Sequence, residues 1–536
     1  MSVVDKVVSG GGRLLALSFL QRGGTFIMNM LVLRHLPTHV SGAGFSLELV
    51  LSTTFIIREG LRLASLRETG LVAHDNAKSS STVPTALRQL INTSWICTAL
   101  GLLCTIAAAL FMAPRLYPID AVDFPTFELS MWLYCLSAAI EFFTEPFYIL
   151  AHTSLLFQLR VQAQGWGFFA KAVVQAVAVL VFNQGMLAFG LSQVAYAVVH
   201  GLVYLRYFVV EQRSSPSFPL ADFAPHVPSG LSPTLMHFWQ TLTFQSILKY
   251  LLTEGDRLVL SAFETPQQQG EYATAFNIGS LAPRLVFLPI EDASKAMFAK
   301  LLASNDAGAS TTSSSTHDAK RLFELSLKFM SLCGLVFVFF GTNYTRTLLY
   351  LLAGYAKTLD QIPVVLSCYC VCVYFLALNG ICEAFVYAVG NEAALQRLNK
   401  FLILFFVVTS ASAIVLMHVC GLGSVGIVLA NCVNMACRIT YCLHYIHAYF
   451  VESSSSSSWL GLVRTSLPHP AVLSMMAVSW VVTFFSEQHF RGPSLVLHAM
   501  HVGVGGVLFL ATAALLWRFE RQFLRDILNV RRTKAE

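Results

Sequence analysis

The sequence predicts an all-α polytopic membrane protein with about fourteen transmembrane helices. Of its 536 residues, 55% are hydrophobic and only 12% are charged, which is about half the charged fraction of a soluble domain. Apolar runs recur along the chain, and many are long enough to cross the ~30 Å hydrocarbon core of a bilayer as helices. The net charge of +6 does not by itself indicate a nucleic-acid partner, because the positions of the charges matter more than their sum.

Charged residues and turn residues bound the apolar runs and define the predicted spans. The N-terminal run is expected to stay as the first span, because no small-residue cleavage pattern follows it. An even number of spans places both termini on one side of the membrane. The predicted spans are residues 13–36, 41–64, 86–112, 126–150, 158–182, 185–208, 235–262, 268–298, 319–341, 361–388, 393–417, 422–448, 468–487 and 494–517.

Lysine and arginine residues are unevenly distributed between the two sides of this topology. With a cytoplasmic N-terminus, most of them lie in cytoplasmic loops or in the C-terminal tail. Cytoplasmic segments near membrane spans are enriched in Lys and Arg, so both termini are predicted to be cytoplasmic. The opposite side keeps only Arg34, Arg115, Arg346, Lys357 and Arg491.

A proline-rich connection follows the sixth predicted span. Residues 211–234 contain five prolines, which is typical of a linker rather than a helix. The sequence therefore predicts an N-terminal lobe of six spans (1–210) and a cytoplasmic linker (211–234). A C-terminal lobe of six spans (235–450) and a segment with two further spans and a basic cytoplasmic tail (451–536) are predicted to follow.

Several cationic side chains lie inside predicted spans, where an arginine costs about 2.5–3.5 kcal/mol even on lenient insertion scales. Such groups face the bundle interior or a water-filled cavity. The guanidinium group offers a planar fork of donors that matches two phosphate oxygens, so a chamber lined by arginines suits a diphosphate. The candidate head-group contacts are Arg22, Arg58, Arg62, Arg284 and Lys249.

The alternative is that these cations pair with carboxylates and hold helices together. The spacing of three between Glu254 and Arg257 favours a pair on one helix face. Lys295 lies three and four residues after Asp292 and Glu291, which favours pairing there too. The candidate structural or gating residues are Glu59, Glu145, Glu254, Asp256, Arg257, Glu291, Asp292 and Glu383.

No motif predicts a catalytic residue, a cofactor or a metal. No Walker-type phosphate loop is present, and the glycines of residues 421–426 join two apolar runs without a preceding strand. The 12 cysteines lack the paired spacing of metal ligands. Asp120 and Asp123 could serve a membrane glycosyltransferase, but no further acidic residues or long loop support that interpretation.

Several segments together resemble the Rft family of endoplasmic-reticulum membrane proteins. They occur in order from the first span to about residue 450. In the second span, Ser52-Thr-Thr54 precedes Arg58 and Arg62. The other similar segments are residues 252–257 (LTEGDR), 277–281 (NIGSL), 287–291 (FLPIE), 145–147 (EPF), 379–380 (NG) and 426–434 (GIVLANCVN).

The resemblance implies the fold of the multidrug/oligosaccharidyl-lipid/polysaccharide exporter superfamily, with two six-helix lobes around a central cavity. It also implies a transporter that moves dolichol-diphosphate-linked heptasaccharide from the cytoplasmic to the lumenal leaflet of the endoplasmic reticulum for N-glycosylation. The expected partners are this glycolipid and membrane lipid, with no nucleotide and no nucleic acid. A non-transporting accessory factor, a membrane glycosyltransferase and a polyspecific drug exporter remain alternatives.

Overall fold

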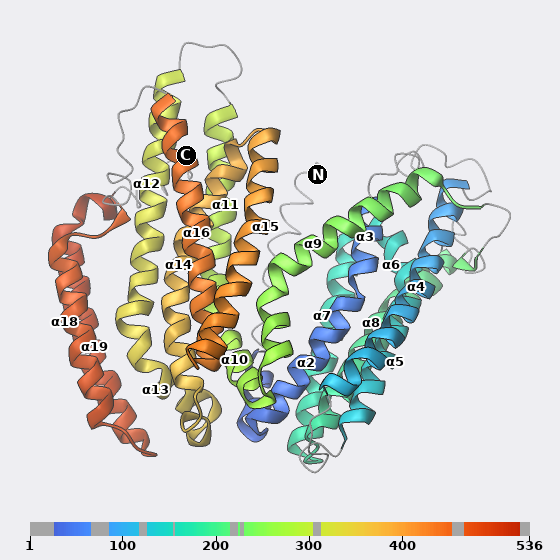
Figure 1. Cartoon of the computed structure of the whole chain (residues 1–536), viewed down its shortest axis with the longest axis horizontal. Coiled ribbons are helices and arrows are strands. Elements are labelled where there is room, and N and C mark those ends of the chain that lie inside the picture. The colour runs from blue at the N-terminus through green and yellow to red at the C-terminus, as the bar shows by residue number, and fades with distance from the viewer. Residues whose placement is uncertain are drawn as a thin grey trace. The chain divides into compact units, whose positions relative to one another are not determined.

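The computed structural model describes residues 26–65, 85–116, 126–153, 156–214, 223–225, 230–303, 312–452 and 466–525. Within these ranges every regular element is helical (Figure 1). Contacts divide the chain into two compact units. The first unit is Met1–Ser261 with Thr265–Gly270, and the second is Ala262–Glu264 with Glu271–Glu536.

In the first unit, helix α8 packs along α7 and α5. Helices α5 and α6 are separated by a 42° bend at Thr144, two residues before Pro146, because a proline cannot continue the hydrogen-bond ladder of the preceding helix. The helices of this unit are α2 (Thr38–Thr54), α3 (Ile56–Ser65), α4 (Thr85–Leu116), α5 (Phe127–Phe143), α6 (Glu145–Thr153), α7 (Phe157–Leu180), α8 (Met186–Ser214) and most of α9 (Pro233–Phe263).

Helix α3 approaches α9 closely at a glycine. A Cβ atom on Gly60 would overlap the backbone of Thr243, so only glycine permits this separation. Beside it, the indole N–H of Trp239 donates to the carbonyl of Ile57 at 3.0 Å. These contacts bind α9 to the first unit.

In the second unit, α14 is contacted by α11, α12, α13 and α16. Around it the buried rings of Phe298, Phe323, Phe385 and Phe450 form a cluster in which neighbouring centroids lie 5.2 to 6.3 Å apart. Three π-helical segments interrupt the α-helices. The elements are most of α10 (Pro266–Gly279), η4 (Pro283–Phe287), α11 (Leu288–Ala303), α12 (Thr312–Val336), η5 (Phe337–Gly341), α13 (Thr342–Ala353), η6 (Tyr355–Thr358), α14 (Ile362–Val389), α15 (Glu392–Ile414), η7 (Val415–Val419), α16 (Gly423–Glu452), α18 (Pro470–His489) and α19 (Leu495–Phe519).

The last two helices, α18 and α19, form a hairpin that packs on η5 and α13 (Figure 1). At one end of the hairpin, Glu520 accepts from Lys328 Nζ at 2.7 Å and from the backbone N–H of His469 at 2.8 Å. Farther along, the Asn343 amide donates to the carbonyl of Trp480 at 2.8 Å. Polar contacts at different positions along its length therefore hold the hairpin against the neighbouring helices.

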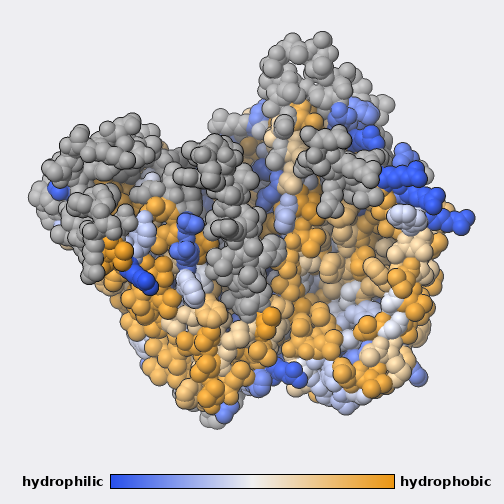
Figure 2. Space-filling model, turned by 180° about the vertical axis from the view of Figure 1, so that it is seen from behind, coloured by the Kyte–Doolittle hydropathy of each residue, from blue (hydrophilic) through white to orange (hydrophobic). Residues whose placement is uncertain are grey.

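Eleven helices among the described residues are long and apolar enough to cross a membrane, and the bent pair α5–α6 raises the number to twelve. Hydrophobic side chains cover much of the surface in Figure 2, and Val507 and Leu510 of α19 are each 69% exposed. The chain is therefore an all-helical polytopic membrane protein. Of the fourteen predicted spans, 13–36 lies partly outside the described residues, and 235–262 forms helix α9, which is not among these candidate membrane helices.

Candidate functional site

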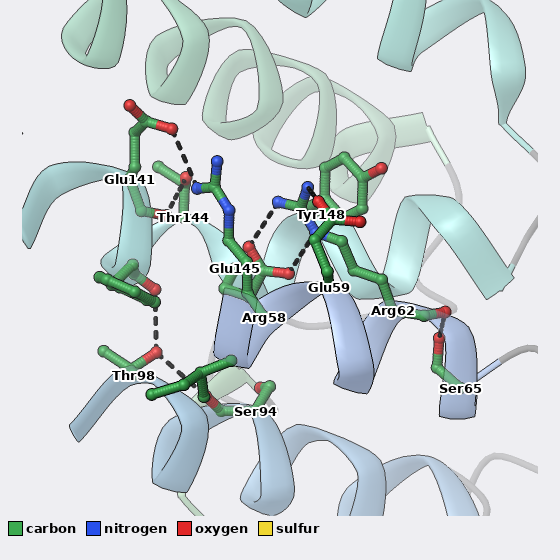
Figure 3. A network of polar contacts seen from close by, with 12 residues as sticks. Arg58, Glu59, Arg62, Ser65, Ser94, Thr98, Glu141, Thr144, Glu145 and Tyr148 are labelled. Carbon is green, nitrogen blue, oxygen red and sulfur yellow. Dashed lines mark hydrogen bonds and ion pairs between the residues drawn. The ribbon is translucent and has the colours of Figure 1, made fainter. Parts of the chain in front are cut away.

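Two arginine–glutamate pairs join α3 to the α5–α6 bend (Figure 3). Arg58 and Arg62 lie one turn apart on α3, and Glu141 and Glu145 lie one turn apart on either side of the bend. Arg58 Nη1 is 2.9 Å from Glu141 Oε2. Arg62 donates through Nε and Nη2 to the two oxygens of Glu145, both at 2.7 Å. The second pair therefore has the bidentate geometry of a strong, charge-assisted interaction.

Both pairs are buried. The side chains of Glu141 and Glu145 are 2% and 1% exposed. The guanidinium carbon of Arg58 lies 3.5 Å from the ring centroid of Phe55, and aromatic faces stabilise such cations. A second charge contact for Arg62 comes from Glu59, 3.3 Å from Nη1. All three nitrogens of Arg62 thus face carboxylates, whereas Nε of Arg58 is buried with no hydrogen-bond partner among the described residues.

A cavity of about 340 Å³ opens beside these pairs. Arg160 enters it from α7, and its Nη2 donates to the Tyr148 hydroxyl at 2.7 Å. Within the described part of the chain, Arg160 has no carboxylate partner, and its Nε has no hydrogen bond. Gln164 and His200 also line the cavity, and His200 Nδ1 is likewise unpartnered there.

Three arginines but only two carboxylates, Glu59 and Glu141, line this cavity, and Glu145 holds Arg62 without lining the cavity itself. Glu141 and Glu145 are held by Arg58 and Arg62, and Glu59 is 55% exposed. Unused N–H donors therefore remain on Arg58 and Arg160. A buried donor without a partner is costly, and an anion with several oxygens, such as a phosphate, would satisfy these donors.

The other predicted residues of the first unit that the structure describes do not line this cavity. Arg22 is outside the described residues. Lys249 is exposed on α9 and does not line the cavity. The pair predicted between Glu254 and Arg257 is confirmed, with the charged atoms 2.8 Å apart. The carboxylate of Asp256 accepts from the backbone N–H of Arg257 at 2.9 Å.

Arg284 belongs to the second unit. It lies in the π-helix η4, where its side chain is exposed and its guanidinium carbon is 5.5 Å from the ring centroid of Phe276. A π-helical turn often marks a functional position. Glu383, in the same unit, pairs with Arg438 at 2.6 Å.

The pairing predicted for Lys295 is wrong. No ion pair joins it to Glu291 or Asp292 in the part of the chain that the structure describes. Its ammonium lies instead 5.1 Å from the ring centroid of Tyr387. Asp292 is exposed, and the Glu291 carboxylate packs against Gly380. Helical spacing permits a contact, but packing against α14 turns these side chains in different directions.

Arg160 is not among the predicted site residues, although it lies near the start of the predicted span 158–182. A signal for the cavity was present in α8. Tyr196, His200 and Tyr204 are spaced by four residues, so they share one helix face, and their rings follow one another at 5.6 and 5.2 Å. Tyr148 contacts both this stripe and Arg160.

Comparisons with known proteins match most of the chain. A family model described as Rft protein matches residues 6–530. The Man(5)GlcNAc(2)-PP-dolichol translocation protein RFT1 of Xenopus tropicalis is 31% identical, over 97% of this chain and 96% of that protein. The protein of the same name from Mus musculus is 30% identical over 88% of this chain and 87% of its own length.

Two solved structures share the architecture at 13% sequence identity. One is the lipid II flippase MurJ in an inward closed conformation, with a TM-score of 0.61 over 94% of this chain and 98% of that chain. The other is an inward-facing multidrug resistance MATE family transporter of the MOP superfamily, with a TM-score of 0.59 over 82% and 96%. These likenesses show an all-helical fold similar to that of MurJ and of the MATE transporter.

Proposed function

Because this chain belongs to the Rft protein family, we propose that it translocates Man5GlcNAc2-diphosphodolichol from the cytoplasmic to the lumenal leaflet of the endoplasmic-reticulum membrane. The two relatives whose names describe this translocation, from Xenopus tropicalis and Mus musculus, match 97% and 88% of the chain. Translocation changes the leaflet of the lipid and none of its bonds, so the protein acts as a transporter and not as an enzyme.

The observation that carries the proposal is the cavity with unused arginine donors. Arg160 has no carboxylate partner among the described residues, and Arg58 keeps a free Nε beside it. A diphosphate supplies several charged oxygens that match these donors. Arg62 lies near the end of the second predicted span and Arg160 near the start of the fifth, so the predicted topology places the cavity near the cytoplasmic side.

These arginines then divide into two roles. Arg58 and Arg160 contact the diphosphate, and Arg62 is held by Glu145 and Glu59 as a support for the cavity wall. A charged head group cannot cross bare hydrocarbon unpaired, so Arg22, Arg284 and Lys249 remain proposed contacts farther along the route. The dolichyl chain stays in the surrounding lipid.

The larger arrangement is part of the proposal. It comprises an N-terminal lobe (1–210), a linker (211–234), a C-terminal lobe (235–450) and a final segment (451–536). The two six-helix lobes would open alternately around a central cavity, as in other two-lobed carriers. The sequence has no Walker-type ATP motif, so transport runs down the gradient that lumenal use of the lipid creates.

Purified protein in liposomes tests the proposal directly. The lipid-linked heptasaccharide is placed in both leaflets, and an externally added mannosidase reports which molecules reach the outer leaflet over time. We expect Arg160→Gln to slow the initial rate by roughly tenfold, the effect of losing one charged hydrogen bond. Arg206→Gln is the matched control, because Arg206 is an exposed arginine on α8 outside the cavity.

Equal rates for Arg160→Gln and wild type would remove this cavity from the transport route. A double Arg22→Ala, Arg284→Ala variant tests the remaining proposed contacts in the same assay. If wild-type protein moved the lipid no faster than protein-free liposomes, the accessory role in the same pathway would replace the transport proposal.

A further inference from the structure

A second cavity lies in the second unit, at the end opposite the Lys328–Glu520 pair. Its volume is about 230 Å³, and its walls come from α13, the η6 turn and the α18–α19 turn. We propose that this cavity binds a phosphate-bearing anion. The proposal goes beyond translocation, because the cavity shares no residue with the site between α3 and the α5–α6 bend.

Arg346 is held in place in one wall before any ligand arrives. Its Nη1 donates to the carbonyl of Thr358 at 2.8 Å, and its Nε lies 3.2 Å from a carboxylate oxygen of Glu487. The remaining nitrogen, Nη2, has no partner among the described residues. A guanidinium fixed in this way loses little conformational freedom when it binds an anion.

Two further donors face the same space from other elements. Arg491, in the α18–α19 turn, is exposed and makes no hydrogen bond or ion pair within the described ranges. The Tyr355 hydroxyl in η6 is also unpartnered among the described residues. Glu487 is the only carboxylate among the lining residues that the structure describes, and it faces two arginines, Arg346 and Arg491. The cavity therefore has an excess of donors and positive charge.

The two histidines of the cavity wall are occupied by neutral hydrogen bonds. His498 contacts the Thr347 hydroxyl and the Gly492 carbonyl, both at 3.1 Å. His501 contacts the Ser486 hydroxyl at 2.8 Å and the Asn343 carbonyl at 3.0 Å. Each ring thus uses both nitrogens, so neither is available as a metal ligand. The arginines are the groups left to bind a ligand.

The predicted topology places these positive charges on the lumenal side of the membrane. It leaves only five Lys or Arg residues on the lumenal side, and Arg346, Lys357 and Arg491 are three of them. All three lie in the cavity wall or in the η6 turn that forms part of it. The anion could be a soluble phosphate compound or the head group of an acidic lipid, since both present the same oxygens.

Binding of inorganic pyrophosphate to the full chain in phosphatidylcholine nanodiscs tests the proposal by calorimetry. We expect Arg491→Gln to weaken binding at this site by roughly tenfold. Because Arg491 is exposed and makes no hydrogen bond or ion pair among the described residues, the variant should melt close to the wild-type temperature. Arg518→Gln, at the other end of α19, is the matched control and should bind like wild type.

Phosphatidic acid added to the nanodiscs separates the two sources of the anion. If the site takes lipid head groups, the added lipid abolishes the Arg491-dependent binding of pyrophosphate; if it takes soluble anions, that binding persists. Either result supports the site. Equal affinity of wild type and Arg491→Gln, with binding lost only in Arg160→Gln, would overturn it and assign all phosphate binding to the first cavity. Neither result depends on whether the protein transports lipid.

Discussion

Replacing Glu145 with glutamine should destabilise the first unit strongly. The substitution keeps the shape of the side chain and removes the charge that faces Arg62 Nε and Nη2, each at 2.7 Å. The Glu145 side chain is 1% exposed, so water cannot replace the lost charge. Leaving one partner of a buried ion pair uncompensated costs about 3–5 kcal/mol. Glu59→Gln is the matched control, because Glu59 is 55% exposed and such pairs contribute about 0–1 kcal/mol.

The assay is the unfolding midpoint of purified protein in mixed micelles with an increasing fraction of sodium dodecyl sulfate. Glu145→Gln should shift the midpoint far more than Glu59→Gln. The double variant Arg62→Met, Glu145→Leu should recover most of the loss, because it removes both charges from the buried position. Equal midpoints for the two single variants would show that burial does not control the strength of these pairs.

Three further predictions use other parts of the structure. Burial lowers the pKa of Lys357 to about 8 from 10.5, although Asp360 raises it. The unfolded chain holds this proton to higher pH, so stability should rise between pH 8 and 10.5. Lys357→Met should lack that rise and be more stable at pH 7 by roughly 2–3 kcal/mol, measured as melting temperature against pH. Gly60→Ala should cost about 1–3 kcal/mol through overlap with α9, and a melting curve equal to wild type would contradict the close contact. Glu520→Gln should weaken the α18–α19 hairpin by about 1.5–3 kcal/mol, measured as a lower melting temperature, with Asp318→Asn as the control because Asp318 is an exposed carboxylate on the same helix as Lys328.

The helical membrane architecture could be predicted because it depends on local properties. Long apolar runs specify membrane helices whatever their neighbours, and the resemblance to the Rft family already implied the exporter fold. The pair between Glu254 and Arg257 could also be predicted, because both residues lie on one helix and spacing alone brings them together.

The partners of Arg58 and Arg62 could not be assigned in the same way. The sequence offered Glu141 and Glu145 among several carboxylates, but only the packing of α3 against the α5–α6 bend selects them. Arg160 shows the same limit. Its position near the start of a predicted span does not distinguish it from other cations near span ends. Only the fold, which packs Tyr148 and α8 around it, identifies it as a cavity residue.

The matched spacing of the two ion pairs limits how the first unit can move. Sliding α3 by one helical turn would be about 5.4 Å and would set Arg58 against Glu145, so Arg62 would lose its bidentate partner and the buried Glu141 would be left without an arginine. Such a slip is strongly disfavoured, so α3, α5 and α6 must travel as one rigid block. Any opening of this protein then has to take place at joints outside that block, and cross-linking α3 to α6 should leave its working cycle intact.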